Sequence, residues 1–230
     1  MNIMIIDTET ANMVEQPIPY DIGYAIVNVE TEEVLTARSF VVAEIFLDTK
    51  LMSSAYYAEK CPKYWKDIKS GKRIMKRAEN IRRQVFKDMH DFQVNTVYAY
   101  NMGFDKRSTN NGMRYITGSS IRWFFPFGTE FKCIWTMACT SILRSKYYIK
   151  FAEENGLVTE AGNLMTSAEA CYKYITKNVD FQEDHTGLED VAIETAIFFK
   201  VLHSRMKYED NINTACWRIP QKRRRELEDE

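Results

Sequence analysis

Residues 3–6 form an unbroken run of apolar side chains, Ile-Met-Ile-Ile, at the start of the chain. A run without polar alternation is typical of a strand that is buried on both faces. Two further runs rich in Val, Ile, Tyr and Phe follow at Tyr20–Val29 and Glu33–Val42, with Glu30–Glu32 between them as a polar turn. Because runs joined by a short turn tend to pair as a hairpin, we expect a three-strand antiparallel meander.

The rest of the chain alternates between helical and strand patterns. Apolar residues at three- and four-residue spacing predict a helix from Ile74 to Phe92 and another from Leu188 to Leu202. Other elements are predicted as strands at Val94–Tyr100 and Phe131–Met137, and as helices at Thr140–Asn155 and Ser167–Lys177. This order predicts an α/β fold with a mixed five-stranded sheet, in which parallel strands join the meander and helices flank it.

Composition excludes several classes of protein. The net charge of −1 counts mildly against a protein that coats DNA or RNA, and it says little about an enzyme that binds only a strand end. The five cysteines show no zinc-finger spacing, so reduced thiols of an intracellular protein are expected. No apolar run is long enough for a membrane span, and Asp7 lies where a signal peptide would be apolar. We therefore expect a cytoplasmic protein that has no contact with membranes.

The first cluster of candidate catalytic or metal-binding residues is Ile6-Asp7-Thr8-Glu9-Thr10. Asp7 and Glu9 are two residues apart, so on a strand they point to the same face. Two adjacent carboxylates repel each other, and a divalent metal relieves that repulsion, with Mg²⁺ or Mn²⁺ suited to oxygen ligands. The alternative is that both acids are solvated where the strand runs into a loop, and for this motif alone that alternative is favoured.

A second cluster, Asn101-Met-Gly-Phe104-Asp105, begins where the strand Val94–Tyr100 stops. Ligand sites in α/β sheets favour such strand ends, and Asp105 adds a third carboxylate. Asn, Gly and Asp also form ordinary turns, so this cluster is weak evidence by itself.

The third cluster is Asp184-His185-Thr186-Gly187-Leu188-Glu189-Asp190. Thr186 and Glu189 have the spacing of a capping box, which places His185 just before the cap and Asp190 at the fourth helical position. An apolar pair usually occupies these two positions, whereas here they hold an imidazole and a carboxylate. We expect both side chains at the same end of the helix. His90 and His203 lack such a context and are expected to be structural or solvated.

Together the three clusters resemble the three motifs of the DEDDh family of 3′–5′ exonucleases, which has the ribonuclease H-like fold and includes the proofreading subunit of bacterial DNA polymerase III. The matching residues are Asp7 and Glu9 for the first motif, Asn101, Phe104 and Asp105 for the second, and His185 and Asp190 for the third. The resemblance covers residues 1–205, which predicts an exonuclease domain over that range. Residues 206–230 would form a C-terminal extension with a flexible charged end. Gly187 departs from the Ala that the family often has, which we expect to cost stability rather than chemistry.

The resemblance implies a site with two Mg²⁺ or Mn²⁺ ions held by Asp7, Glu9, Asp105 and Asp190, and with His185 as general base. These five residues are the predicted catalytic set. Thr8 and Thr10 flank Glu9 and are predicted to bind the substrate's 3′ terminus, and Asn101 and Phe104 are predicted substrate contacts. The alternative for the two threonines is that they are only strand-forming residues, and the two readings have equal weight.

The expected reaction is hydrolysis of single-stranded or frayed DNA from its 3′ end, which releases nucleoside 5′-monophosphates. An exoribonuclease of the same family is a close alternative, because no residue here reports on the 2′-hydroxyl. A non-catalytic nucleic-acid or replisome binding module is a second alternative, and a phosphodiesterase of small nucleotides is a third. The enzyme could be free-standing or have a replication-complex protein as partner. Two aromatic and basic stretches, Tyr56–Trp65 and Arg122–Phe131, could hold a strand, although core packing is expected for most of their residues.

Overall fold

The computed structural model describes residues 1–229 and divides the chain into two compact units. The first unit comprises Met1–Tyr98, Phe104–Glu130 and Asp184–Val191. The second unit comprises Ala99–Gly103, Phe131–Glu183 and Ala192–Glu230. Each unit is formed by segments that are distant in the sequence, so the chain passes between them more than once.

The predicted meander is confirmed in the first unit. Strand β1 (Asn2–Ala11) pairs antiparallel with β2 (Ile18–Asn28), and β2 pairs antiparallel with β3 (Val34–Val42). Ile3 to Ile6 are fully buried, as their apolar run predicts. Strand β5 (Thr96–Ala99) joins β1 in parallel, with Met4 opposite Val97. This pairing places β1 inside the sheet, and the full burial of Ile3 to Ile6 on both faces explains their lack of polar alternation.

Within residues 1–229 the sheet has six strands in the order β4-β3-β2-β1-β5-β6, so the prediction of a mixed sheet is confirmed and the number five is wrong. The additional strand is β4 (Ile74–Lys76), which pairs in parallel with β3 at the sheet edge. We predicted that a helix begins at Ile74, but helix α4 covers Ala78–Asp91. Three residues are too few for a strand periodicity, so the apolar spacing of the following helix masked β4.

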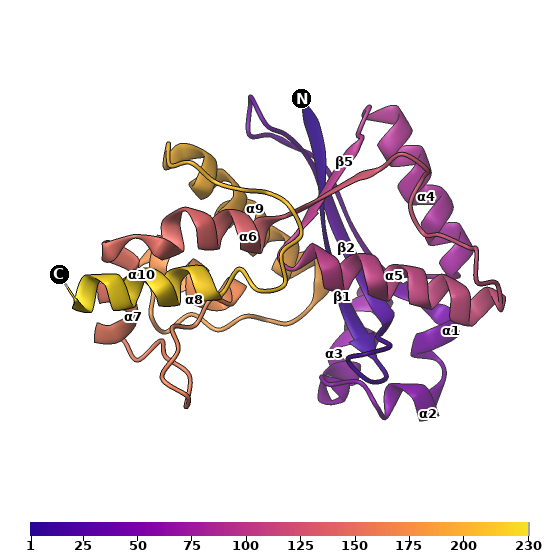
Figure 1. Ribbon diagram of the computed structural model, residues 1–230. Helices are drawn as coiled ribbons and strands as arrows, with labels where there is room; N and C mark the ends of the chain where they lie inside the picture. Colours follow the sequence, from indigo (N-terminus) through magenta and orange to yellow (C-terminus); the bar gives the residue numbers. More distant parts are fainter. Residues whose placement is uncertain (230) are drawn as a thin grey trace. The chain divides into compact units, whose positions relative to one another are not determined.

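The helices of the first unit lie around this sheet (Figure 1). They are α1 (Ala43–Phe46), α2 (Thr49–Met52), the short helix η1 (Ala58–Lys60), α3 (Cys61–Ser70), α4, and nearly all of α5 (Met102–Thr117). Helix α4 packs on the face of β2 that carries Tyr24, whose hydroxyl donates to Asp88 at 2.7 Å. Because side chains alternate along a strand, Asp21 and Gly23 lie on the opposite face of β2. Their register partners on β1 are Glu9 and Asp7, which therefore also lie on that face.

The second unit is largely helical, and α6, α7, α8 and α10 lie together in Figure 1. Its elements are α6 (Ile134–Thr140), η2 (Ile142–Arg144), α7 (Lys146–Glu154), α8 (Ala168–Thr176) and α10 (Arg218–Glu228), with most of β6 (Glu130–Cys133) and of α9 (Gly187–His203). The predicted strand Phe131–Met137 ends at Cys133, and the predicted helix Thr140–Asn155 starts at Lys146. Ser145 caps α7 by accepting from the Tyr148 amide, which fixes that start.

The charged C-terminal segment, for which a flexible end was expected, forms helix α10. The Gln221 side chain accepts from the Leu164 amide at 2.9 Å and donates to the Leu164 carbonyl at 3.0 Å. Arg224 forms an ion pair with Glu153 at 2.8 Å. These contacts attach α10 to α7 and to the loop before α8, so buried polar bonds compensate for the small apolar content of the helix.

No helix within residues 1–229 combines the length and the apolar character that crossing a bilayer requires. Over the same range the five cysteines are free thiols, and four of them are buried.

Candidate active site

Three of the predicted catalytic side chains converge in the first unit. One carboxylate oxygen each from Glu9 and Asp190 and a ring nitrogen of His185 all lie within 4.8 Å of one another. Glu9 is on β1, His185 precedes α9, and Asp190 is in the first turn of α9. The expectation that His185 and Asp190 meet at one end of a helix is confirmed. Among the described residues, Asp7 and Asp105 are outside this tight group of ligand atoms.

Helix α9 begins against the sheet at a contact between two glycines. A Cβ atom on Gly23 would lie 2.2 Å from the carbonyl carbon of Gly187, and one on Gly187 would lie 2.7 Å from the Gly23 amide nitrogen. The same Cβ on Gly187 would lie 3.3 Å from the carbonyl oxygen of Asp7. A larger residue at either position would push α9 away from the strand that carries Asp7 and Glu9. The departure of Gly187 from the family's Ala therefore has a steric reason, in addition to its expected cost in helix stability.

Asp105 is buried and is held by the neighbour of Asp7. The Thr8 hydroxyl donates to Asp105 Oδ1 at 2.8 Å, and it also lies 2.8 Å from the Ser108 hydroxyl. Burial raises the pKa of Asp105 to about 7, although the hydrogen bond from Thr8 opposes this rise. A nearby cation would offset that burial cost and return the carboxylate to its charged form. Thr8 thus positions Asp105 in this structure, and its predicted contact with substrate stays a prediction.

A buried charge network holds the start of α9 on the sheet. Asp21 Oδ2 accepts from the Gly187 amide at 3.0 Å, from the Tyr64 hydroxyl at 2.7 Å and from Arg73 at 3.1 Å. Arg73, whose side chain is 1% exposed, also forms ion pairs with Asp67 at 3.1 Å and with Glu189 at 2.5 Å. These contacts link β2, α3 and α9 around one guanidinium group.

The pKa values of this network reflect burial and charge together. Burial disfavours the charged form of Arg73, but Asp21 and Glu189 outweigh that effect and raise its pKa. Burial also disfavours the charged form of Glu189, yet hydrogen bonds from Lys72 and Thr186 and the charge of Arg73 lower its pKa to about 2. Glu189 is therefore a carboxylate near neutral pH. It accepts from the Thr186 hydroxyl at 2.7 Å, so the predicted capping pair is present with the two side chains bonded to each other.

The segment before α9 is held by a different set of contacts. The His185 backbone adopts φ of 46°, a left-handed conformation that is uncommon for residues other than glycine. Its ring stacks on Tyr57, with centroids 4.3 Å apart and planes inclined by 12°. Lys60 donates to the Asp184 carbonyl and Lys63 forms an ion pair with the Asp184 carboxylate at 2.5 Å. The loop around η1 therefore contacts both the imidazole and the residue that precedes it.

The remaining predicted substrate contacts are more dispersed. Thr10 is half-buried on β1, just after a register shift between Glu9 and Thr10. Phe104 is half-buried in the first unit, 5.7 Å from the Arg107 guanidinium. Asn101 is exposed, belongs to the second unit, and has a left-handed φ of 96°. Nothing in these positions tests their predicted roles.

The two aromatic stretches divide between core and surface, so core packing is confirmed for fewer of their aromatic residues than expected, and Trp65 and Trp123 are exposed. Tyr64, Phe124 and Phe125 are buried, whereas Tyr56 and Phe127 are exposed. Sequence reasoning missed Tyr57 as a contact of His185 and Arg73 as the centre of the buried network. Asp21, a carboxylate inside the apolar run of β2, was the one available signal of that network.

The donor set suits a hard divalent cation. Asp7, Glu9, Asp105 and Asp190 offer carboxylate oxygens, and Asp105 is a buried acid that a cation would stabilise. Removing several carboxylates from water without a counter-charge costs free energy, and a bound cation offsets that cost. The residues present therefore fit a Mg²⁺ or Mn²⁺ site.

No protein-family model matches this sequence, and the curated proteins give no significant match. Solved structures of 3′-exonucleases share the fold. One structure, of histone mRNA stem-loop recognition by a 3′-exonuclease, has a TM-score of 0.53 at 13% identity over 91% of this chain and 85% of that chain. A full-length 3′-exonuclease has a TM-score of 0.51 at 13% identity, over 91% and 63% of the two chains. E. coli exonuclease I with a dA13 oligonucleotide has a TM-score of 0.50 at 12% identity, over 89% and 41%. The predicted ribonuclease H-like fold of 3′-exonucleases is thus confirmed.

Proposed function

We propose that this chain is a divalent-metal-dependent 3′–5′ exonuclease that releases nucleoside 5′-monophosphates. The observation that carries the proposal is the convergence of Glu9, Asp190 and His185 within 4.8 Å, on a fold shared with 3′-exonucleases. Carboxylates and an imidazole at this separation can serve metal binding and proton transfer in one site. The sequence motifs support the same assignment.

Each of the five predicted catalytic residues then has a role in the reaction. Asp7, Glu9, Asp105 and Asp190 would hold Mg²⁺ or Mn²⁺, two ions per site, as the family resemblance implies. When bound, the metal would acidify a water molecule and offset charge on the scissile phosphate. His185 accepts a proton from the attacking water at a ring nitrogen. The new P–O bond forms as the bond to the preceding nucleotide's 3′ oxygen breaks, and that oxygen takes a proton and becomes the new 3′-hydroxyl.

DNA with a single-stranded or frayed 3′ end is the proposed substrate, and RNA is the alternative. Among proteins with this fold, one binds a histone mRNA stem-loop and another binds a deoxyadenosine oligonucleotide, so the fold accommodates either polymer. Matched DNA and RNA oligonucleotides labelled at the 5′ end, incubated with Mg²⁺ or Mn²⁺, separate the two. The preferred substrate should give a ladder shortened by single nucleotides from the 3′ end.

The Asp7→Ala variant distinguishes an enzyme from a non-catalytic binding module. We expect it to lose nearly all metal-dependent hydrolysis while it keeps the wild-type circular dichroism spectrum. If the wild-type protein shortens no single-stranded 3′ end with either metal, the proposed activity is wrong.

A further inference from the structure

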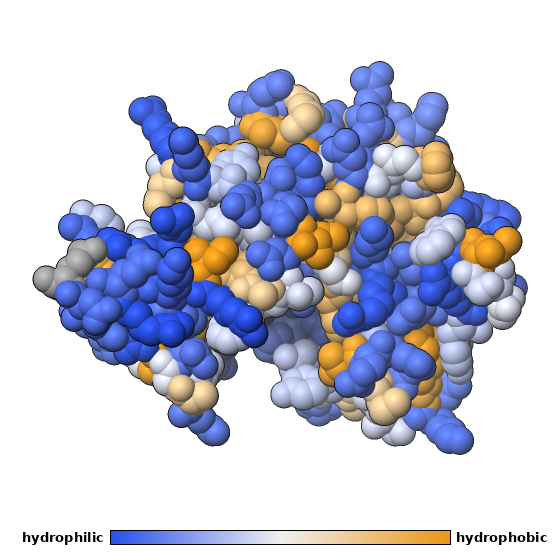
Figure 2. Space-filling view, in the orientation of Figure 1, coloured by the Kyte–Doolittle hydropathy of each residue, from blue (hydrophilic) through white to orange (hydrophobic). Residues whose placement is uncertain are grey.

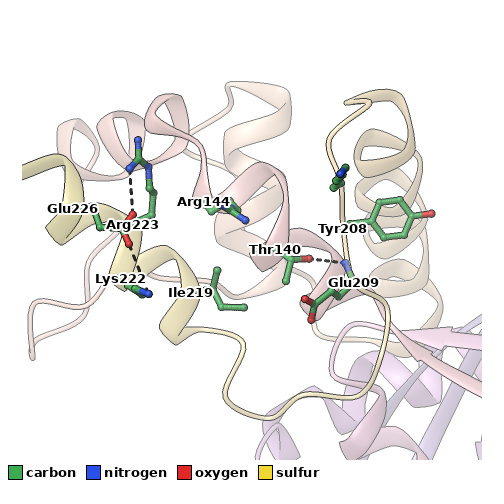
Figure 3. Close-up of a pocket in the computed structure, with 9 residues that line it drawn as sticks. Thr140, Arg144, Tyr208, Glu209, Ile219, Lys222, Arg223 and Glu226 are labelled. Atoms are coloured by element: carbon green, nitrogen blue, oxygen red, sulfur yellow. Dashed lines mark hydrogen bonds and ion pairs between the residues drawn. The ribbon is translucent and has the colours of Figure 1, made fainter. Parts of the chain in front are cut away.

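The second unit contains an open pocket that none of the predicted catalytic residues line. It has a volume of about 570 Å³. Figure 3 shows α10 on one side and the segment containing Tyr208 and Glu209 on the other, with Arg144 and Thr140 between them. Lys207 completes the basic lining with Arg144, Lys222 and Arg223. All of these residues belong to one compact unit.

The charges in this pocket are unevenly neutralised. Lys222 and Arg223 share the Glu226 carboxylate, at 3.9 Å and 3.2 Å. Arg144 and Lys207 are both exposed, and neither forms an ion pair with any residue in the described range 1–229. Four cations and the two carboxylates of Glu209 and Glu226 line the pocket, which leaves a formal surplus of two positive charges. The two unpaired cations are available to an anionic ligand.

The positive surface continues along α10. A neighbouring pocket shares Lys222 and Glu226 with the first and adds Arg218, Arg225 and Asp229, so three cations and two carboxylates line it. Helix α10 has five basic residues and two acidic ones, a formal charge of +3, in a chain whose net charge is −1. Arg218, Lys222 and Arg225 recur at i, i+4 and i+7, so they lie along one face of the helix. Figure 2 shows a strongly hydrophilic surface over α10.

Tyr208 lines the pocket on the side opposite α10 and is 40% exposed, and its ring points away from α10 (Figure 3). Bases stack on exposed aromatic side chains while Lys and Arg neutralise the phosphates that link them. We infer that this pocket, with Arg144, Lys207, Tyr208 and Lys222, binds the phosphodiester backbone and one base of a single-stranded nucleic acid.

The inference rests on the proposed function, because a nuclease substrate is the polyanion that this chain must meet. An acidic protein segment would satisfy the cations equally, but it would gain less from an exposed aromatic ring at the edge of the pocket. A single strand uses both features. The surface would therefore bind the polymer without reading its sequence, and long strands should bind more tightly than short ones.

The test is the affinity of the full chain for a fluorescent oligothymidylate, measured by anisotropy with EDTA present so that no cleavage occurs. The Arg144→Glu/Lys207→Glu double variant should bind at least about tenfold more weakly, and the slope of log K against log salt concentration should fall by about 1.4 for two lost phosphate contacts. Tyr208→Ala should weaken binding by about fivefold or more through lost stacking.

Matched controls lie in the same unit. Lys200→Glu reverses an exposed cation outside the pocket, and Tyr147→Ala removes an exposed ring that is 69% exposed and next to Lys146. Both controls should bind like the wild type. The double variant should still release mononucleotides from a dinucleotide at the wild-type rate, because a dinucleotide needs only the catalytic residues.

The outcomes separate this inference from the proposed activity. If the wild type shortens 3′ ends but the double variant and Tyr208→Ala bind oligothymidylate as tightly as it does, the inference is overturned. It is also overturned if a Glu-rich peptide competes for the pocket while Tyr208→Ala leaves oligonucleotide affinity unchanged. If the wild type releases no mononucleotides but binding depends on these residues, the proposed activity fails and the binding surface stands.

Discussion

Asp190 and His185 are five residues apart, yet they are supported in opposite ways. The start of α9, from Gly187 to Asp190, is held by buried contacts to Asp21 and Arg73. The segment Asp184–His185 is held by contacts at the surface, in which Lys63 and Asp184 are 33% and 53% exposed. The proposed metal ligand therefore lies on an element held by buried contacts, whereas the proposed base follows a residue held by exposed contacts.

This difference matters because the two groups have different tasks. A metal ligand must be in place before the ion arrives, and its precision depends on packed neighbours. A base that takes a proton from water needs its correct position only when substrate is bound, so support by weaker, exposed contacts is tolerated. Removing a partner from a buried ion pair costs about 3–5 kcal/mol, whereas an exposed pair contributes about 0–1 kcal/mol. The two regions should therefore respond very differently to substitution.

The largest effect is expected for Arg73→Leu. It leaves Asp21 buried without its cationic partner and should lower the free energy of unfolding by about 3–5 kcal/mol. Denaturant unfolding measures this loss. Lys72→Leu is the control, because Lys72 also pairs with Glu189 but is 51% exposed, and its effect should stay below about 1 kcal/mol. Equal losses of unfolding free energy in the two variants would contradict the claim that the buried ion pairs of Arg73 stabilise the fold more than the exposed ion pair of Lys72.

Gly187→Ala should have the next largest effect, because its Cβ would lie 2.7 Å from the backbone of Gly23. The overlap should cost about 1–3 kcal/mol of stability and displace Asp190 from Glu9, with activity reduced at least about tenfold. Gly103→Ala is the control, since its Cβ meets a movable Ile212 side chain at 3.2 Å. Single-turnover rates and thermal unfolding of both variants measure the effect, and wild-type activity of Gly187→Ala would contradict the steric account.

Tyr57→Ala removes the ring on which His185 stacks. An aromatic pair contributes about 0.5–1.5 kcal/mol, so a fall in kcat of roughly twofold to tenfold is expected, with little change in thermal stability. The neighbouring Tyr56, whose ring is exposed, provides the control Tyr56→Ala. A Tyr57→Ala variant with unchanged kcat would show that the stacked arrangement does not contribute to the reaction.

Lys63→Ala should have the smallest effect of the series. The lost ion pair with Asp184 is largely exposed, so the expected change in kcat is about twofold or less, and it should diminish further at high salt. Rates measured over a range of ionic strength test this. A loss comparable with that of Gly187→Ala would mean that the segment before α9 is as rigidly supported as the helix.

Much of the first unit could be predicted because its signals are local. The apolar run Ile3–Ile6 predicts a doubly buried strand, and Thr186 with Glu189 predicts where α9 begins. Both depend on the periodicity or the capping chemistry of adjacent residues. The proximity of His185 and Asp190 follows from the helix start alone.

The rest depends on contacts between distant residues. Arg73 is an ordinary basic residue in the sequence, and its role arises from Asp21, Asp67 and Glu189 meeting it in the folded chain. Residues 134–137 were predicted to continue a strand but belong to helix α6, because a short apolar run has no period that separates a buried helix from a buried strand. A flexible end was predicted because the segment from Lys222 onward is almost entirely charged. The bonds between Gln221 and Leu164 that attach helix α10 span 57 positions, so local sequence does not reveal them.

The most direct test of the central claim compares the wild type with Asp190→Asn, which removes one carboxylate charge and keeps the side-chain shape. The measurement is release of the labelled 3′-terminal nucleotide from a single strand with Mn²⁺ present. We expect the wild type to release the nucleoside 5′-monophosphate and Asp190→Asn to be slower by about 100-fold or more, with an unchanged melting temperature. Release at equal rates by the two proteins would contradict the assignment of this site.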